Sequence, residues 1–115
     1  EVRDSRLSAV LLKQRGLRDD AAFARWWRES REASRPQSGR QTERELRRKG
    51  VGSETASNAV ADWDDAEAAY AAARKRAKAL AGLARETYRR RLFAHLLRRG
   101  FSRGVALAAA LQVEG

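Results

Sequence analysis

The chain has 115 residues, of which 25 are basic and 15 acidic, and its formal net charge is +10. This length suffices for one compact domain or for a few small units that share a core. Because the chain has no cysteine, disulfides and thiolate metal sites are excluded, and no apolar run is long enough to span a bilayer. Alanine is frequent and isoleucine is absent, which disfavours a sheet. We therefore expect an all-α protein that is soluble in the cytoplasm.

The charge is unevenly distributed along the chain. Residues 1–50 and 69–115 are basic, whereas residues 51–68 contain acidic side chains and no basic one. A basic surface of this kind attracts polyanions with an affinity that falls steeply as salt rises. The charge therefore favours a nucleic acid or a nucleoprotein as the partner.

The first predicted helix ends at a glycine. The spacing of Leu7, Val10 and Leu11 predicts a helix to about Arg15, and Gly16 stops it.

A second helix follows, with Asp19 or Asp20 as its cap. Pro36 ends this helix, because proline cannot continue the hydrogen-bond ladder. Its apolar face comprises Phe23, Trp26, Trp27 and Ser30.

The third and fourth predicted helices flank Gly50. The third covers about residues 40–49 with Leu46 as its apolar anchor, and Gly50 ends it in a left-handed conformation that glycine adopts readily. Ser53 caps the fourth helix. The apolar stripe of the fourth helix comprises Ala56, Ala59, Val60 and Trp63.

A capping box, formed by Asp64 and Glu67, predicts the start of a fifth helix that runs to about Leu80. Gly82 then interrupts the helical pattern. The expected inner face comprises Ala66, Ala69, Tyr70, Ala73, Ala77 and Leu80.

The sixth predicted helix covers about residues 84–99, and Gly100 ends it. Ser102 caps a seventh helix. The apolar residues of the sixth helix are Tyr88, Leu92, Phe93, Leu96 and Leu97, and those of the seventh are Val105, Ala108, Ala109 and Leu111.

The sequence repeats itself. ELRRKGV (45–51) and HLLRRGF (95–101) share a leucine, two basic residues, a glycine and an apolar residue, and the pair Asp19–Asp20 recurs at Asp64–Asp65. In each corner the leucine and the apolar residue are expected to pack together across the glycine turn. Self-similarity of this kind indicates duplicated three-helix units. We expect a curved array with the last helix of a truncated first repeat in 1–17, a second repeat in 18–63 and a third in 64–115.

Four stretches resemble the RecX regulatory proteins, which modulate the bacterial recombinase RecA. They are GLRDDAAFARWWRESR (16–31), ELRRKGV (45–51), DDAEAAYAAARKRAKALAG (64–82) and YRRRLFAHLLRRGF (88–101). The resemblance covers nearly the whole chain, although Ala84 stands where an acidic cap is expected. It implies a regulator of DNA repair and recombination, linked to the SOS response. Such a regulator lies in the helical groove of RecA–single-stranded DNA filaments and usually inhibits ATP hydrolysis and strand exchange.

Basic side chains are the candidates for contact with DNA or a filament. Single-stranded DNA, and double-stranded DNA as a second form, would bind to them through phosphates. One of the adjacent Trp26 and Trp27 belongs to the core, and Trp27 is the candidate for a half-exposed aromatic residue. The basic candidates are Arg25, Arg28, Arg31, Arg47, Arg48, Lys49, Arg74, Lys75, Lys78, Arg89, Arg90, Arg98, Arg99 and Arg103.

Catalysis finds no support in the sequence, and we expect neither a cofactor nor a metal ion. His95, the single histidine, lies among apolar residues and is interpreted as a packing or surface residue. The four aspartates of the repeated pairs are interpreted as helix caps and not as metal ligands.

Two other classes of function are open. A helix-turn-helix module that reads DNA sequence ranks second, because the helix after Gly50 offers no basic residue in its early turns. A scaffold that binds an acidic protein is the other alternative. We expect a monomer that does not associate with membranes.

Overall fold

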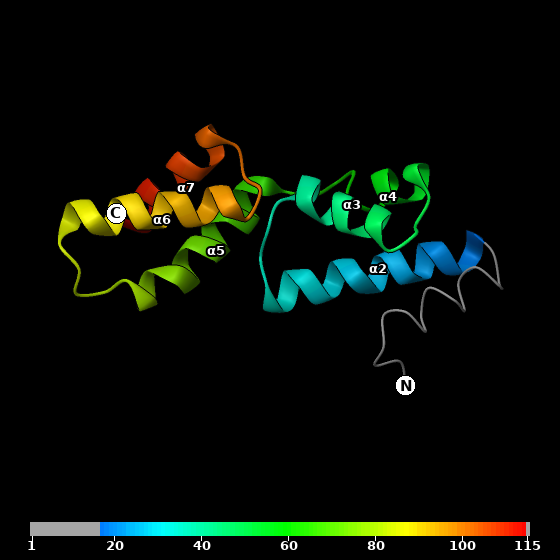
Figure 1. The fold of residues 1–115 in the computed structure, drawn as a ribbon, viewed down its shortest axis with the longest axis horizontal. Helices are drawn as coiled ribbons and strands as arrows, with labels where there is room; N and C mark the ends of the chain where they lie inside the picture. The colour runs from blue at the N-terminus through cyan, green and yellow to red at the C-terminus, as the bar shows by residue number, and fades with distance from the viewer. Residues whose placement is uncertain (1–16, 115) are drawn as a thin grey trace.

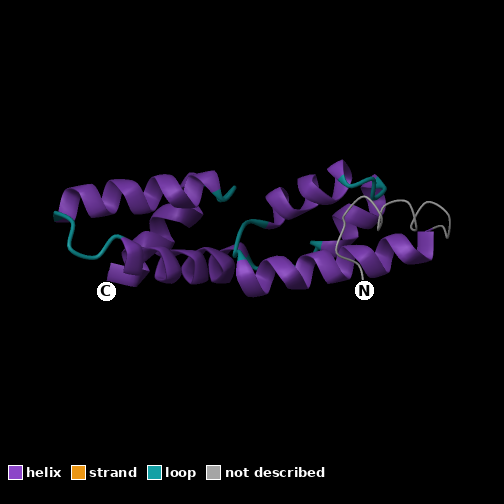
Figure 2. Cartoon of the chain, turned by 60° about the horizontal axis from the view of Figure 1, so that its bottom comes forward, coloured by secondary structure: helices purple, strands orange, loops and turns teal. Residues whose placement is uncertain are grey.

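The computed structural model describes residues 17–114, and in this part of the chain every regular element is a helix (Figure 2). The predicted helix of Leu7, Val10 and Leu11 lies outside the described residues. The all-α prediction is confirmed for the rest. The helices are α2 (Leu17–Ser34), α3 (Gly39–Arg48), α4 (Ser53–Ala59), α5 (Asp65–Ala79), α6 (Arg85–Arg98) and α7 (Arg103–Glu114).

The helices form two three-helix units that follow one another along the longest axis of the molecule (Figure 1). The chain is elongated, with principal extents of 53 × 25 × 17 Å. Each unit has its own apolar core. The core of α2–α4 comprises Phe23, Ala24, Trp27, Leu46, Val51 and Ala56, and that of α5–α7 comprises Ala69, Ala72, Ala73, Leu80, Leu92, Leu96, Phe101, Ala106 and Ala109.

A glycine corner joins the second and third helices of each unit, as the repeat predicts. Gly50 and Gly100 have φ angles of 97° and 95°, a region that costs other residues roughly 1–2 kcal/mol. The amide of Phe101 donates to the carbonyl oxygen of Leu96 at 3.3 Å, and both side chains are buried. The predicted apolar clasp is therefore confirmed.

Two of the predicted caps are present. The Asp64 carboxylate accepts a hydrogen bond from the amide of Glu67 at 3.1 Å and begins α5. The Ser102 hydroxyl accepts one from the amide of Val105 at 3.3 Å before α7. Ala84 precedes α6 and makes no side-chain cap, which fits its lack of a polar group.

Two other predicted caps are wrong. The N-cap of α4 is Gly52 and not Ser53, which is already helical. Helix α2 begins at Leu17, so Asp19 and Asp20 lie inside its first turn. Carboxylates there still stabilise the helix, because its N-terminus carries partial positive charge.

The predicted inner faces of the alanine-rich helices are only partly correct. Ala66 of α5 and Ala108 and Leu111 of α7 are exposed, whereas Ala72 and Ala106 are buried. Alanine occurs on several sides of both helices, so periodicity alone does not show which side packs. The close approach of α5 and α7 selects that side.

The second unit is docked on the first through the Gly100 corner. The amide of Ser38 donates to the carbonyl oxygen of Arg99 at 3.1 Å. A Cβ atom on Gly100 would overlap the Ser38 hydroxyl and lie 3.0 Å from Cβ of Gln41. Gly100 is therefore required twice, for the turn and for this close contact.

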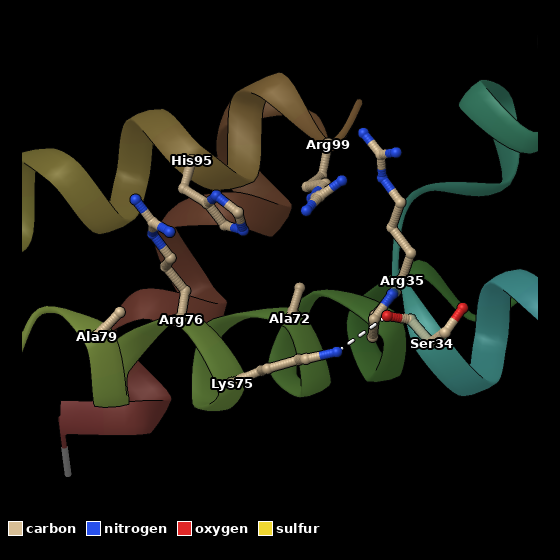
Figure 3. Close-up of a pocket in the computed structure, with 9 residues that line it drawn as sticks. Ser34, Arg35, Ala72, Lys75, Arg76, Ala79, His95 and Arg99 are labelled. Carbon is tan, nitrogen blue, oxygen red and sulfur yellow. Dashed lines mark hydrogen bonds between the residues drawn. The ribbon is translucent and has the colours of Figure 1, made fainter.

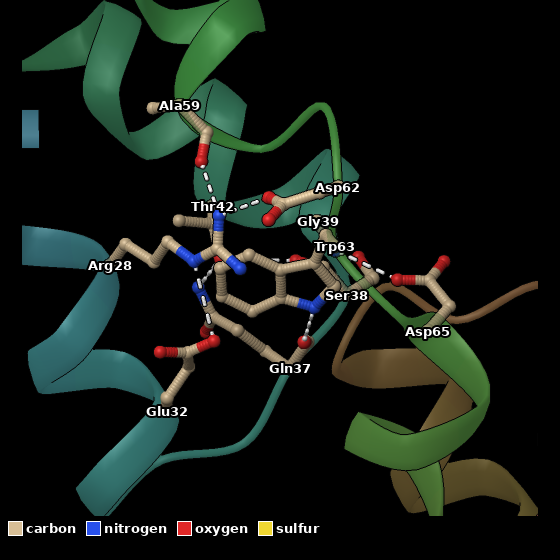
Figure 4. A network of polar contacts seen from close by, with 10 residues as sticks. All are labelled: Arg28, Glu32, Gln37, Ser38, Gly39, Thr42, Ala59, Asp62, Trp63 and Asp65. Carbon is tan, nitrogen blue, oxygen red and sulfur yellow. Dashed lines mark hydrogen bonds and ion pairs between the residues drawn. The ribbon is translucent and has the colours of Figure 1, made fainter. Parts of the chain in front are cut away.

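Trp63 completes the joint between the units (Figure 4). The sequence places it on the stripe of α4, but that helix ends at Ala59, and Trp63 lies in the connection to α5. Its Nε1 donates to the carbonyl oxygen of Gln37 at 3.1 Å, and a Cβ on Gly39 would lie 3.0 Å from its ring. The amide of Gly39 in turn donates to Oδ1 of Asp65 at 3.0 Å, which ties α3 to the start of α5.

Candidate nucleic-acid and filament interface

Four of the predicted basic residues form ion pairs within the chain. Arg28 donates to the carboxylates of Asp62 and Glu32 and lies over the Trp63 ring at 5.0 Å (Figure 4). Arg89 makes two hydrogen bonds to the Glu114 carboxylate, at 2.6 and 2.8 Å. Arg47 pairs likewise with Glu43, one helical turn before it. Arg31 pairs with Glu45 at 3.1 Å. These four side chains have structural partners, so they contribute less to an interface than the sequence indicates.

Trp27, the predicted half-exposed aromatic, is buried instead. Its side chain is 8% exposed, whereas that of Trp26 is 52% exposed. Nε1 of Trp27 donates to Oε1 of Glu45 at 2.8 Å, and Arg31 and Lys49 lie over its ring at 4.4 and 5.0 Å. The two cations over its ring and the carboxylate at its Nε1 hold Trp27 in place, so the exposed aromatic is Trp26.

Seven other candidates are exposed and scattered over both units. None of them forms an ion pair with another side chain of residues 17–114. They are Arg25, Arg48, Arg74, Lys78, Arg90, Arg98 and Arg103.

The remaining two, Lys75 and Arg99, meet at a cavity between the end of α2 and helices α5 and α6 (Figure 3). This joint cavity has a volume of about 260 Å³. Nζ of Lys75 donates to the carbonyl oxygen of Ser34 at 2.9 Å. The cavity is lined by Ser34, Arg35, Pro36, Ala72, Lys75, Arg76, Ala79, His95 and Arg99.

Arg35, Arg76 and His95 also line the joint cavity, although none of them is among the candidates predicted from the sequence. Arg35 lies in the loop after α2, and only the fold brings it to Arg99. Arg76 lies one helical turn after Ala72 on α5, and His95 of α6 lies one turn before the C-cap Arg99, so each pair lies on one face of its helix. This spacing is the signal in the sequence that could have found them.

The electrostatic environment of the joint cavity is strongly positive. Burial lowers the pKa of Arg99, and four neighbouring arginines lower it further, namely Arg35, Arg76, Arg31 and Arg98. Burial and the charges of Arg99, Arg76 and Arg98 lower the pKa of His95 to about 4. At pH 7 the imidazole is therefore neutral. No ion pair within residues 17–114 involves Arg35, Arg76 or Arg99, so the positive charge of the cavity is not compensated there.

Within the described residues, no three histidine, aspartate or glutamate side chains gather so that they could hold a metal ion. None of the helices from α2 to α7 combines the length and the apolar character that crossing a membrane requires.

Comparison with known proteins identifies the two units. Residues 19–60 match the family model "RecX, second three-helix domain", and residues 63–109 match "RecX, third three-helix domain". These matches define the class as a tandem three-helix-repeat protein. The chain belongs to the RecX family of regulatory proteins, as the resemblance of its four stretches predicts.

Curated relatives support this assignment. "Regulatory protein RecX" of Streptomyces coelicolor is 40% identical over 106 residues, which cover 87% of this chain and 56% of the relative. The protein of the same name from Thermobifida fusca is 37% identical over 123 aligned positions, covering 100% of this chain and 66% of the relative. That from Amycolatopsis mediterranei is 37% identical over 98 residues, 83% of this chain and 56% of the relative. The chain thus spans between 56% and 66% of the length of these relatives, which are named as regulators and not as enzymes. No solved structure matches the chain.

Proposed function

We propose that this chain regulates the RecA recombinase without catalysing a reaction of its own. It binds RecA–single-stranded DNA filaments as a monomer in the bacterial cytoplasm, lies in their helical groove and reduces ATP hydrolysis and strand exchange. Family membership supports RecA as the target, because the RecX proteins resembled by this chain act on that recombinase.

We further propose that residues 18–63 and 64–115 are the second and third repeats, preceded in 1–17 by the last helix of a first repeat. An array of such repeats is an extended surface and not a closed pocket.

The observation that carries the proposal is the shape of the chain together with its charge. The array is 53 Å long, and exposed basic side chains occur on both units. An elongated, basic body contacts several successive subunits and phosphates of a filament at once, and its affinity then falls steeply with salt.

The helix-turn-helix alternative is less well supported by the side chains of the two candidate recognition helices. Helix α4 has seven residues and no basic one, and α7 has Arg103 as its single basic residue. Base readout in the major groove depends on basic and amide side chains at the start of such a helix.

Cosedimentation with filaments tests the proposal. The chain is mixed with RecA and single-stranded DNA in the presence of a slowly hydrolysed ATP analogue, with RecA alone and DNA alone as matched controls. We expect more chain in the pellet with the filament than with the two controls together. Equal recovery of the chain with naked DNA and with the filament would contradict the proposal. Recovery of the chain in the pellet after nuclease has removed the DNA, so that no filament is left, would contradict it too.

A further inference from the structure

The two three-helix units correspond residue by residue. An offset of 45 residues aligns the first helices, so that buried Ala24 matches buried Ala69. In the second helix of each unit and in the corner after it, the offset is 50. Leu46 therefore matches Leu96, and both are 0% exposed. The glycines of the corners align by the same offset. Positions in one unit therefore have structural counterparts in the other.

In the first unit, four residues form a closed cluster. Arg31 and Lys49 both lie over the Trp27 indole, with their charged groups 4.4 and 5.0 Å from the ring centroid. Oε1 of Glu45 accepts hydrogen bonds from Nε1 of Trp27 at 2.8 Å and from Nε of Arg31 at 3.1 Å. The ring fills the space, and the carboxylate compensates the positive charge.

The counterparts of these four residues are Ala72, Arg76, His95 and Arg99, and all four line the joint cavity. The two cationic positions remain cationic. The indole, however, is replaced by a methyl group, and the carboxylate by an imidazole. Figure 3 shows Arg76 extending from α5 toward His95 on α6, with Arg99 beside it.

The second unit thus lacks both the bulk and the negative charge that close the cluster in the first. The result is a cavity of about 260 Å³ between cations. Arg35 and Lys75 add two further charges at its edge, and no carboxylate of residues 17–114 pairs with its arginines. Arginines concentrated without a counter-ion form a site for an anion with several oxygen atoms.

We propose that the joint cavity binds a phosphate group of the single-stranded DNA backbone, with the phosphate oxygens in the place that the Glu45 carboxylate has in the first unit. Arg76 and Arg99 hold the phosphate, and the imidazole of His95 donates a hydrogen bond to it. The small apolar lining, from Ala72 and Pro36 among others, offers no large surface for the side chains of an acidic peptide. Among residues 17–114, no Phe, Tyr or Trp lines the cavity, so the sugar-phosphate chain and not a base is recognised. The inference rests on the proposed function, since it identifies where the DNA of the filament is contacted.

His95→Glu tests the proposal directly, because it installs the counter-ion that the first unit has. Since His95 is neutral at pH 7, this substitution lowers the net charge by one, and so does Arg91→Ala on the exposed side of the same helix. Binding of a short single-stranded oligonucleotide is measured by fluorescence anisotropy. We expect H95E to weaken binding about tenfold, as for the loss of one charge-assisted hydrogen bond, and R91A to weaken it less than about twofold, as for a surface charge. Equal losses in the two variants would overturn the proposal.

A second variant and a second measurement test the proposal even if H95E does not fold. Arg76→Gln removes an exposed cavity cation, and we expect a loss greater than that of R91A; a loss no greater than that of R91A would overturn the proposal. The chain has one histidine, so NMR of the imidazole reports on the cavity without ambiguity. The bound phosphate offsets the charges of Arg99 and Arg76, so the pKa of His95 rises above about 4 when the oligonucleotide is added. An unchanged His95 pKa with the oligonucleotide bound would likewise overturn it.

Three probes identify the source of the anion. An abasic strand that binds with the same sensitivity to H95E confirms recognition of the backbone. Sensitivity to H95E with inorganic phosphate but not with the abasic strand would show that the cavity takes a free anion and would overturn the proposal. If H95E weakened the binding of polyglutamate alone, the partner of the cavity would be an acidic protein, and the proposal would be overturned. All these assays use naked strands, so failure of the chain to cosediment with RecA filaments would refute the proposed function separately.

Discussion

Replacement of Gly100 by alanine tests how the two units are joined. Gly50, Gly82 and Gly100 have nearly the same φ, between 95° and 97°. A Cβ on Gly50 or Gly82 meets no atom within 4 Å, whereas a Cβ on Gly100 overlaps the hydroxyl of Ser38. The substitutions G50A and G82A therefore measure the cost of the backbone conformation alone, and G100A measures that cost together with the loss of docking.

The expected losses of unfolding free energy differ between G50A and G100A, because only G100A disturbs the contacts of Ser38. A left-handed alanine costs roughly 1–2 kcal/mol, which we expect for Gly50→Ala. In Gly100→Ala the corner must move away, and the buried amide of Ser38 loses its 3.1 Å hydrogen bond to Arg99. A buried donor without a partner costs about 1–3 kcal/mol, so we expect a total loss of roughly 2–5 kcal/mol.

Urea unfolding followed by circular dichroism measures these free energies of unfolding. The m-value also shows whether the two units still unfold together. Equal destabilisation by G50A and G100A would refute the docking of the second unit on Ser38.

Three further predictions concern the clusters around Trp27 and His95. Trp27→Ala should lower the free energy of unfolding by about 3–5 kcal/mol, as for a buried aromatic residue, and Trp26→Ala by less than about 1 kcal/mol; similar losses in urea titrations would show that the wrong indole is placed in the core. Burial alone would raise the pKa of Glu45, but hydrogen bonds from three donors outweigh it and hold the pKa below 4.5. Its stabilising effect is then present above pH 4.5 and lost as the pH falls through the folded-state pKa, so Glu45→Gln should cost less stability near pH 3 than at pH 7 in thermal melts; a cost independent of pH would contradict this. His95 has a pKa of about 4 in the fold against 6.5 in the unfolded chain, so stability should rise between pH 4 and 6.5, and in His95→Gln this rise should be reduced; an unaltered pH profile would argue against a half-buried neutral imidazole.

Features that depend on neighbouring residues in the sequence could be predicted. The corners at Gly50 and Gly100 follow from a leucine four residues before a glycine and an apolar residue after it, because all the partners lie within six positions. The cap formed by Asp64 is equally local. Ser53 failed as a cap because the preceding Gly52 already occupies that position.

Features that depend on tertiary contacts could not be predicted. Trp26 and Trp27 differ by one position on the same helix, and the partners that select Trp27 come from α3 and its C-cap, namely Glu45 and Lys49. The joint cavity likewise combines Arg35 of a loop with residues of two later helices. The repeats in the sequence nevertheless indicate part of this cavity. When they are aligned, Ala72 takes the position of Trp27, and His95 takes the position of Glu45.

DNA-dependent ATP hydrolysis by RecA on single-stranded DNA, titrated with this chain at two salt concentrations, tests the central claim most directly. We predict dose-dependent inhibition at amounts of chain well below those of RecA and of DNA binding sites, weaker at the higher salt concentration. An unchanged rate, measured under conditions in which the chain binds naked DNA in a salt-sensitive manner, would contradict regulation of the RecA filament.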